Sequence, residues 1–93
     1  MADVIVKKEI IVKNKTGLHA RPAAMFVQIA NKFESEITIT KEDQKVNGKS
    51  IMGILMLAAE KGSRITIIAE GVDAAAAVEE LSQVLLSDIE KKK

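Results

Sequence analysis

The feature that most limits the fold of this chain is the alternation of two hydrophobic periods along it. The β-branched run Val4–Val12 predicts a strand, and apolar residues spaced three and four apart predict a helix from about Ala20 to Lys32. The alternating segment Ile37–Thr40 predicts a second strand, and Lys45–Asn47 predicts a short third strand after a tight turn. The first half of the chain therefore mixes strands with a helix.

The second half continues this mixture. The apolar segment Ile51–Ala59 follows Ser50 and predicts a short helix that ends before Gly62, while Arg64–Ala69 predicts another strand. Asp73 is a candidate N-cap for a last helix. Its apolar face consists of Ala74, Ala77, Val78, Leu81, Leu85 and Ile89.

The resulting order, β-α-β-β-α-β-α, predicts an α+β fold with two layers. We expect the helices on one side of an antiparallel sheet, with the side that carries Thr38 and Thr40 facing water. The length of 93 residues allows one domain, residues 1–93, and we expect residues 91–93 to form a flexible tail.

Composition excludes several classes of function. The net charge is +1 and the only aromatic residues are Phe26 and Phe33, which argues against nucleic-acid binding. The absence of Cys excludes disulfides and most zinc sites, and a single His leaves no two-His metal site. We therefore expect no metal and no cofactor.

The chain has no apolar targeting segment near its start. Its longest uncharged stretches, Pro22–Asn31 and Ser50–Ala59, have ten residues each, whereas a membrane span needs about 20. We expect a cytoplasmic protein that does not insert into membranes, and a monomer.

His19 stands where a turn meets a helix. The free N–H groups of a first helical turn bind anions, and the positive end of the helix favours a neutral, nucleophilic imidazole. Arg21 offers a planar fork that suits phosphate oxygens. These residues form a candidate phosphoryl acceptor, although His19 as a polar residue beside a solvated Arg21 is the alternative.

The string Gly17–Ala23, read as Gly-Leu-His-Ala-Arg-Pro-Ala, resembles the active-site signature of the HPr family. These proteins are the histidine-containing phosphocarriers of the bacterial phosphoenolpyruvate-dependent sugar phosphotransferase system. The resemblance continues through Val46–Gly53 and Ala58–Gly62 to the final helix, with Gly48 as a departure, since relatives often carry Ala or a bulkier residue there. It implies an open-faced sandwich of four antiparallel strands covered on one face by three helices.

The resemblance also implies roles for residues and partners. His19 is the histidine phosphorylated on Nδ1, assisted by Arg21; Enzyme I donates the phosphate and the IIA units of sugar permeases receive it. The protein is then a reactant of phosphotransferase enzymes and not itself an enzyme. We expect Thr16, Ala20 and Pro22 in the partner-binding surface, although Thr16 is alternatively only a turn residue.

Ser50 has two compatible interpretations. It is an N-cap for the helix that follows. Its context also resembles the regulated branch of the family, in which the HPr kinase/phosphorylase modifies this serine and links it to carbon catabolite control. A helix N-terminus tolerates a phosphate well, and the resemblance implies a transcriptional regulator as a partner of that form.

The helix after Ser50 has more apolar residues than one buried face uses. Ile51, Met52 and Leu55 share a side and predict an exposed docking patch, whereas Ile54 and Leu57 are better placed for the core. The alternative is that all the apolar residues of this helix belong to the core.

Three other functions compete with the carrier. A regulatory module of the same fold lacks the phosphorylatable histidine, which this chain retains as His19. A carrier of a nitrogen-related system is disfavoured by the string Lys49–Gly53, which favours the sugar branch. A generic ligand-binding or RNA-binding α+β domain fits the element order alone, but few aromatics and near-neutral charge argue against RNA.

Overall fold

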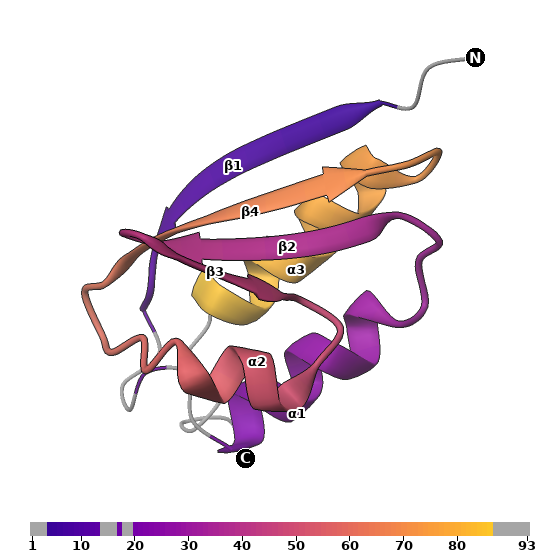
Figure 1. Ribbon diagram of the computed structural model, residues 1–93. Coiled ribbons are helices and arrows are strands. Elements are labelled where there is room, and N and C mark those ends of the chain that lie inside the picture. The colour runs from indigo at the N-terminus through magenta and orange to yellow at the C-terminus, as the bar shows by residue number, and fades with distance from the viewer. Residues whose placement is uncertain (1–3, 14–16, 18–19, 87–93) are drawn as a thin grey trace.

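The strands and helices of the chain follow the predicted order. A computed structural model describes residues 4–13, 17 and 20–86. Its elements are β1 (Ile5–Ile11), α1 (Ala20–Ala30), β2 (Glu36–Lys41), β3 (Gln44–Asn47), α2 (Ile51–Met56), β4 (Arg64–Glu70) and α3 (Ala74–Leu86) (Figure 1). The predicted β-α-β-β-α-β-α order and the α+β class are confirmed.

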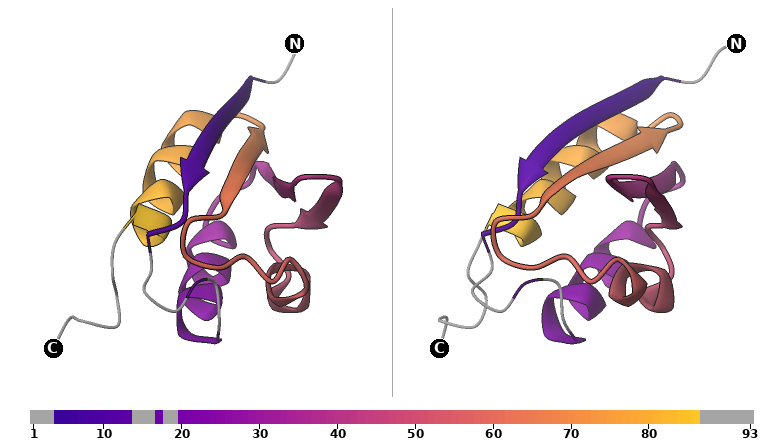
Figure 2. Two further views of the ribbon diagram at one scale, coloured as in Figure 1. Left: turned by 90° about the vertical axis from the view of Figure 1, so that its left-hand side faces the viewer. Right: turned by 60° about the vertical axis from the view of Figure 1, so that its left-hand side comes forward.

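The four strands form one antiparallel sheet in the order β1-β4-β2-β3. Ile67 of β4 lies opposite Ile39 of β2, and Ile39 lies opposite Val46 of β3. Because side chains alternate along a strand, these residues all face the same layer. The three helices cover this face, and the other face of the sheet is open (Figures 1 and 2).

The core lies between the sheet and the helices. Phe26 of α1 is fully buried, and the predicted apolar face of α3 is buried over its described part, while Ile89 lies outside the described residues. On the sheet side the buried residues alternate along the strands, as period two requires. They are Ile10 of β1, Ile37 and Ile39 of β2, and Ile65, Ile67 and Ala69 of β4.

Two helices end earlier than the sequence predicts. The amide of Lys32 bonds to the carbonyl of Ile29 at 3.0 Å, an i→i−3 contact that tightens the chain after α1 ends at Ala30. Helix α2 ends at Met56 because Ala58 takes a left-handed conformation with φ 52°. Gly62 lies beyond this turn and does not end the helix.

Asp73 precedes α3, as predicted, but its side chain bonds elsewhere. The backbone amides of Glu34 and Ser35 donate to its carboxylate at 2.9 Å each, and the Ser35 hydroxyl also donates. The Ser35 hydroxyl, followed by the Glu34 amide, holds the pKa of Asp73 below its usual range. Asp73 thus ties the start of α3 to the segment that leads into β2.

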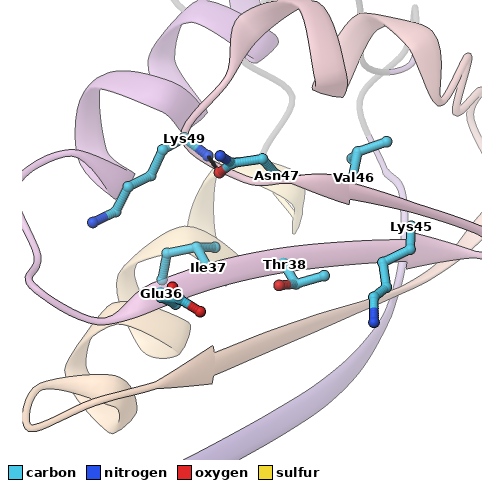
Figure 3. A pocket seen from close by; sticks show the side chains of 7 residues that line it. All are labelled: Glu36, Ile37, Thr38, Lys45, Val46, Asn47 and Lys49. Carbon is cyan, nitrogen blue, oxygen red and sulfur yellow. Dashed lines mark hydrogen bonds between the residues drawn. The ribbon is translucent and has the colours of Figure 1, made fainter.

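The open face of the sheet is polar around β2. Thr38 and Thr40 alternate with the buried Ile37 and Ile39 and are half-buried on this face, as predicted. A shallow depression lies beside them, lined by Glu36, Ile37, Thr38, Lys45, Val46, Asn47 and Lys49 (Figure 3). It contains none of the residues that the sequence assigns to phosphate transfer or docking.

Candidate functional site

The predicted phosphorylation motif leads directly into helix α1. Its histidine, His19, and the neighbouring Thr16 lie outside the described residues. Helix α1 begins at Ala20, the residue after His19, so the free amides of its first turn follow the histidine in the chain. This is the placement that the sequence predicts for an anion site at a helix N-terminus.

Some residues of this first turn are exposed and others are buried. Ala20 and Arg21 are exposed, whereas Pro22 and Ala23 are buried. Pro22 therefore lies beneath the surface that a partner would touch, where its fixed φ supports the first helical turn. Ala20 and Arg21 remain accessible.

Gly17, which precedes this helix in the chain, has a conformation and a contact that require glycine. Its φ is 77°, in the left-handed region that favours glycine. A Cβ at this position would lie 2.6 Å from the carbonyl oxygen of Ala59 and 2.8 Å from Cα of Glu60. The glycine of the motif is thus required by a close contact with the connection between α2 and β4.

The Arg21 side chain is unpaired within the described part of the chain. The two ion pairs found there join Lys32 to Glu80 and Arg64 to Glu9. An exposed guanidinium without a carboxylate partner is available to a phosphate group.

Ser50 is the N-cap of α2, which confirms one of its two predicted roles. Its backbone is extended, with φ −115° and ψ 120°, and its Oγ accepts a hydrogen bond from the Gly53 amide at 3.1 Å. The carbonyl of Ser50 accepts from the Ile54 amide at 3.0 Å. The side chain is half-buried, so the hydroxyl lies at the rim of the surface that α2 presents.

Helix α2 exposes most of its apolar side chains. Ile54 of α2 and Leu57, the residue after the end of the helix, are fully buried, as predicted. The exposed fractions of the others are 41% for Ile51, 65% for Met52, 40% for Leu55 and 66% for Met56. We call these four residues the α2 surface. The predicted exposure of Ile51, Met52 and Leu55 is confirmed, and the structure adds Met56.

Two lysines hold the ends of α2, and sequence reasoning missed both. Lys41 Nζ donates to the carbonyl of Leu57 at 3.2 Å and to that of Ala58 at 3.4 Å, which satisfies groups left free where α2 ends. Lys49 Nζ donates to the carbonyl of Phe33 at 2.7 Å, just before the N-cap. These contacts attach α2 to β2 and to the end of α1, so the α2 surface is held in place at both ends.

The structure gives Gly48 a packing role that the sequence does not predict. It is buried, and a Cβ there would lie 2.5 Å from Cγ2 of Ile37 and 3.0 Å from its Cβ. The glycine that departs from the family's usual residue is therefore required by the packing of Ile37 in this chain.

Comparison with known proteins places the chain in a family. Residues 6–87 match the PTS-HPr family model, which is described as the PTS HPr component phosphorylation site. The chain therefore belongs to the HPr family, which contains phosphocarrier proteins, not enzymes, together with HPr-like Crh proteins.

Three relatives illustrate the range of the family. The HPr-like protein Crh of Halalkalibacterium halodurans is 54% identical over 95% of this chain and 100% of its own length. The crystal structure of HPr from Bacillus anthracis is 51% identical, covers 88% of this chain and 98% of its own, and has a TM-score of 0.85. The catabolite-repression protein Crh of Bacillus subtilis is 48% identical, covers 86% of this chain and 92% of its own, and has a TM-score of 0.70.

These relatives confirm the resemblance to the HPr family and the open-faced fold. The Bacillus subtilis Crh structure is described as a dimer with a swapping domain. The expectation that this chain is a monomer is therefore not supported by this relative. Among the described residues, no helix has the length and apolar character needed to cross a membrane.

Proposed function

We propose that this chain is the phosphoryl carrier between Enzyme I and the IIA units of sugar permeases, with His19 as the residue that carries the phosphate. The observation that supports this best is the complete motif Gly17–Ala23, which runs into the first turn of helix α1. A purely regulatory module of this fold would lack the phosphorylatable histidine, whereas this chain has it as His19.

The transfer exchanges one phosphorus–nitrogen bond for another. Nδ1 of His19 attacks the phosphorus of the Enzyme I phosphohistidine, and the bond from phosphorus to the Enzyme I nitrogen breaks. In the second transfer, a histidine of the IIA unit attacks the phosphorus on His19. The bond between phosphorus and Nδ1 of His19 then breaks, and the phosphate leaves the carrier. The first-turn amides of α1 and the Arg21 guanidinium stabilise the negative oxygens during both transfers.

The test is incubation with Enzyme I and labelled phosphoenolpyruvate, followed by mapping of the acid-labile phosphate. We expect one labelled residue, His19, and no acid-labile label on His19→Ala. Acid-labile label on His19→Ala, or none on the wild type, would contradict the proposal.

Arg21 has a matched control within the chain. Arg21→Ala is expected to slow transfer to His19 by about ten- to a hundredfold, because one charge-assisted contact with phosphate is lost. The other arginine, Arg64, is also exposed and lies on β4, so Arg64→Ala is expected to leave the rate unchanged. Equal rates for the two variants would show that Arg21 is only solvated.

Ser50 is the proposed regulatory site, phosphorylated by an HPr kinase/phosphorylase. A phosphate there adds about −1.5 to −2 charges beside Ile51 and Met52. That charge raises the cost of desolvating the α2 surface, so it weakens docking on Enzyme I, while the helix N-terminus accommodates it. The same charge fits a partner with a basic pocket, for which a transcriptional regulator of carbon catabolite control is the proposed candidate.

The experiment for Ser50 compares Ser50→Asp with Ser50→Ala. We expect the aspartate variant to need a higher carrier concentration for the same rate of His19 phosphorylation, with little change in melting temperature, since Asp is also a good N-cap. The alanine variant is expected to lose some thermal stability but to keep its rate at temperatures where it is folded. A normal rate for Ser50→Asp would contradict regulation at this position.

A further inference from the structure

The chain between α2 and β4, residues 57–63, lies beside the end of β1, and we call it the α2–β4 connection (Figure 2). The amide of Gly62 donates to the carbonyl of Val12 at 2.9 Å, and the Val12 amide donates to the carbonyl of Ser63 at 2.9 Å. Inside the connection, the Glu60 amide donates to Oγ of Ser63 at 2.9 Å, and the Ser63 amide donates to the Glu60 carbonyl at 2.9 Å. These bonds give the connection a defined shape and attach it to the end of β1.

The α2–β4 connection also contacts the first residue of the phosphorylation motif. Gly17 lies so close to it that a Cβ there would lie 2.6 Å from the carbonyl oxygen of Ala59 and 2.8 Å from Cα of Glu60. Gly17 comes two residues before His19 in the chain, and α1 begins at Ala20, immediately after the histidine. A displacement of Ala59 and Glu60 would therefore displace the backbone that leads to the histidine.

The α2–β4 connection contains an unfavourable backbone conformation just before this contact. Ala58 has a φ of 52°, in the left-handed region that disfavours residues with a Cβ. A residue in such a conformation keeps it only where the surrounding contacts impose it. The contacts that hold Ala58 therefore also determine the position of Ala59, the buried residue that follows it.

Lys41, at the end of β2, provides a contact of this kind. Its Nζ donates to the carbonyl of Leu57 at 3.2 Å and to the carbonyl of Ala58 at 3.4 Å. No other group in the described part of the chain donates to these two carbonyls. Because they lie on either side of Cα of Ala58, both can reach one ammonium group only for a particular φ and ψ of that residue. The lysine therefore stabilises the left-handed conformation of Ala58.

We propose that Lys41 is a positioning residue for phosphoryl transfer at His19. It holds the conformation of Ala58 and, through it, the part of the α2–β4 connection that contacts Gly17. Transfer between two proteins requires the reacting nitrogen and phosphorus to be aligned, and a misplacement of about 1 Å lowers a rate by about a hundredfold. This inference rests on the proposed phosphoryl transfer and adds to it a residue outside the motif.

The test follows single-turnover transfer from phosphorylated Enzyme I over a range of carrier concentrations. This separates the rate at saturation from the concentration that gives half of that rate. Lys41→Met removes the ammonium group and keeps an unbranched side chain. It is expected to lower the rate at saturation by about tenfold and to change the half-maximal concentration by less than about threefold. The second value changes little because Ile54 and Leu57 still hold the α2 surface on the core.

Two further variants separate positioning from a simple loss of charge. Lys45 of β3 is exposed and makes no side-chain hydrogen bond or ion pair within the described ranges, so Lys45→Met is expected to keep the wild-type rate. The double variant Lys41→Met/Ala58→Gly places glycine in the left-handed conformation, which glycine adopts without strain, and is expected to recover the wild-type rate within about threefold. All rates are measured at a temperature where the melting curves show each variant fully folded.

A spectroscopic readout does not depend on Enzyme I. The chain has one histidine, so its imidazole signals in NMR spectra belong to His19. Lys41→Met is expected to shift these signals and the amide signal of Gly17, whereas Lys45→Met is expected to leave them in place. The double variant Lys41→Met/Ala58→Gly is expected to return them toward the wild-type positions.

Three results would overturn positioning by Lys41. The first is equal saturation rates for Lys41→Met and Lys45→Met. The second is an effect confined to the half-maximal concentration, which would assign Lys41 to docking. The third is a double variant that stays slow, which would show that Ala58 does not transmit the effect. A wild type that accepts no acid-labile phosphate would contradict the proposed function itself, and the NMR signals alone would then decide whether Lys41 positions the histidine.

Discussion

Helices α2 and α3 differ in how much of their apolar surface is buried. Over 13 residues, α3 buries a continuous face against the sheet, and Leu86 at its end is its only large apolar side chain that is clearly exposed. Over six residues, α2 buries only Ile54 and exposes four large apolar side chains.

This difference separates two uses of hydrophobic residues. The apolar face of α3 is buried in the core, so its residues contribute to stability. The α2 surface contributes little to the core, yet it is held at both ends by Lys41 and Lys49. An apolar surface that is fixed but uncovered is typical of a site where partners bind.

The largest expected effect distinguishes two leucines. Leu81 of α3 is fully buried, whereas Leu55 of α2 is 40% exposed. Leu81→Ala is expected to lower the free energy of unfolding by about 2–5 kcal/mol, because it opens a cavity in the core. Leu55→Ala is expected to cost less than about 1 kcal/mol, and urea unfolding measures both. Equal losses would show that α2 is as structural as α3.

The next prediction tests docking with a matched pair of charges. Met52→Asp places a carboxylate on the α2 surface, where Met52 is 65% exposed, and Val72→Asp places one on an even more exposed apolar residue before α3, where Val72 is 81% exposed. Met52→Asp is expected to raise the carrier concentration needed for half-maximal transfer from Enzyme I by about tenfold, the loss of one central interface contact. A similar rise for Val72→Asp would mean that net charge, rather than the α2 surface, controls docking.

The third prediction concerns pH at the start of α3. Folding lowers the pKa of Asp73 from its ordinary 3.8, so this carboxylate stabilises the fold above that pH. The stabilisation is lost as the pH falls through the lower pKa of the folded state. Asp73→Asn is therefore expected to melt below the wild type at neutral pH, with the difference shrinking below about pH 4.

Asp43, exposed in the turn between β2 and β3, provides the control for this substitution. Asp43→Asn has no comparable set of hydrogen bonds among the described residues to lose, and it is expected to melt close to the wild type at neutral pH. A constant difference between Asp73→Asn and the wild type down to pH 2 would contradict the role of the Asp73 carboxylate.

The smallest effect is expected where α2 ends. Ala58 has a φ of 52°, a conformation that costs an L-residue about 1–2 kcal/mol. Glycine removes that cost but adds freedom to the unfolded chain, so Ala58→Gly is expected to stabilise the fold by less than about 1 kcal/mol. Thermal unfolding measures it, and a clear loss of stability would show that Cβ of Ala58 makes a favourable contact.

The contrast between the two helices also explains what the sequence predicts well. The period of α3 is long and regular, so its core face follows directly from the positions of Ala77, Leu81 and Leu85. The α2 surface is predictable for the opposite reason. A segment that is apolar at nearly every position has more hydrophobic residues than one face of a short helix can bury.

Other features depend on contacts between distant residues and leave no local pattern. Asp73 bonds to Ser35 and Lys41 bonds to Leu57, pairs far apart in the chain. The requirement for Gly48 arises from Ile37, which the fold places beside it. The left-handed conformation occurs at Ala58 and not at a glycine or asparagine, so the residue type does not predict it.

Following a phosphate onto the chain and from it to the next protein tests the carrier function most directly. Chain phosphorylated by Enzyme I is separated from the enzyme and mixed with a IIA unit of a sugar permease, and the label on each protein is measured over time. A carrier is expected to lose its acid-labile label from His19 as the IIA unit gains an equal amount, with Ser50 unlabelled throughout. Label that stays on the chain, or leaves only as free phosphate, would contradict the proposal that this protein is a carrier.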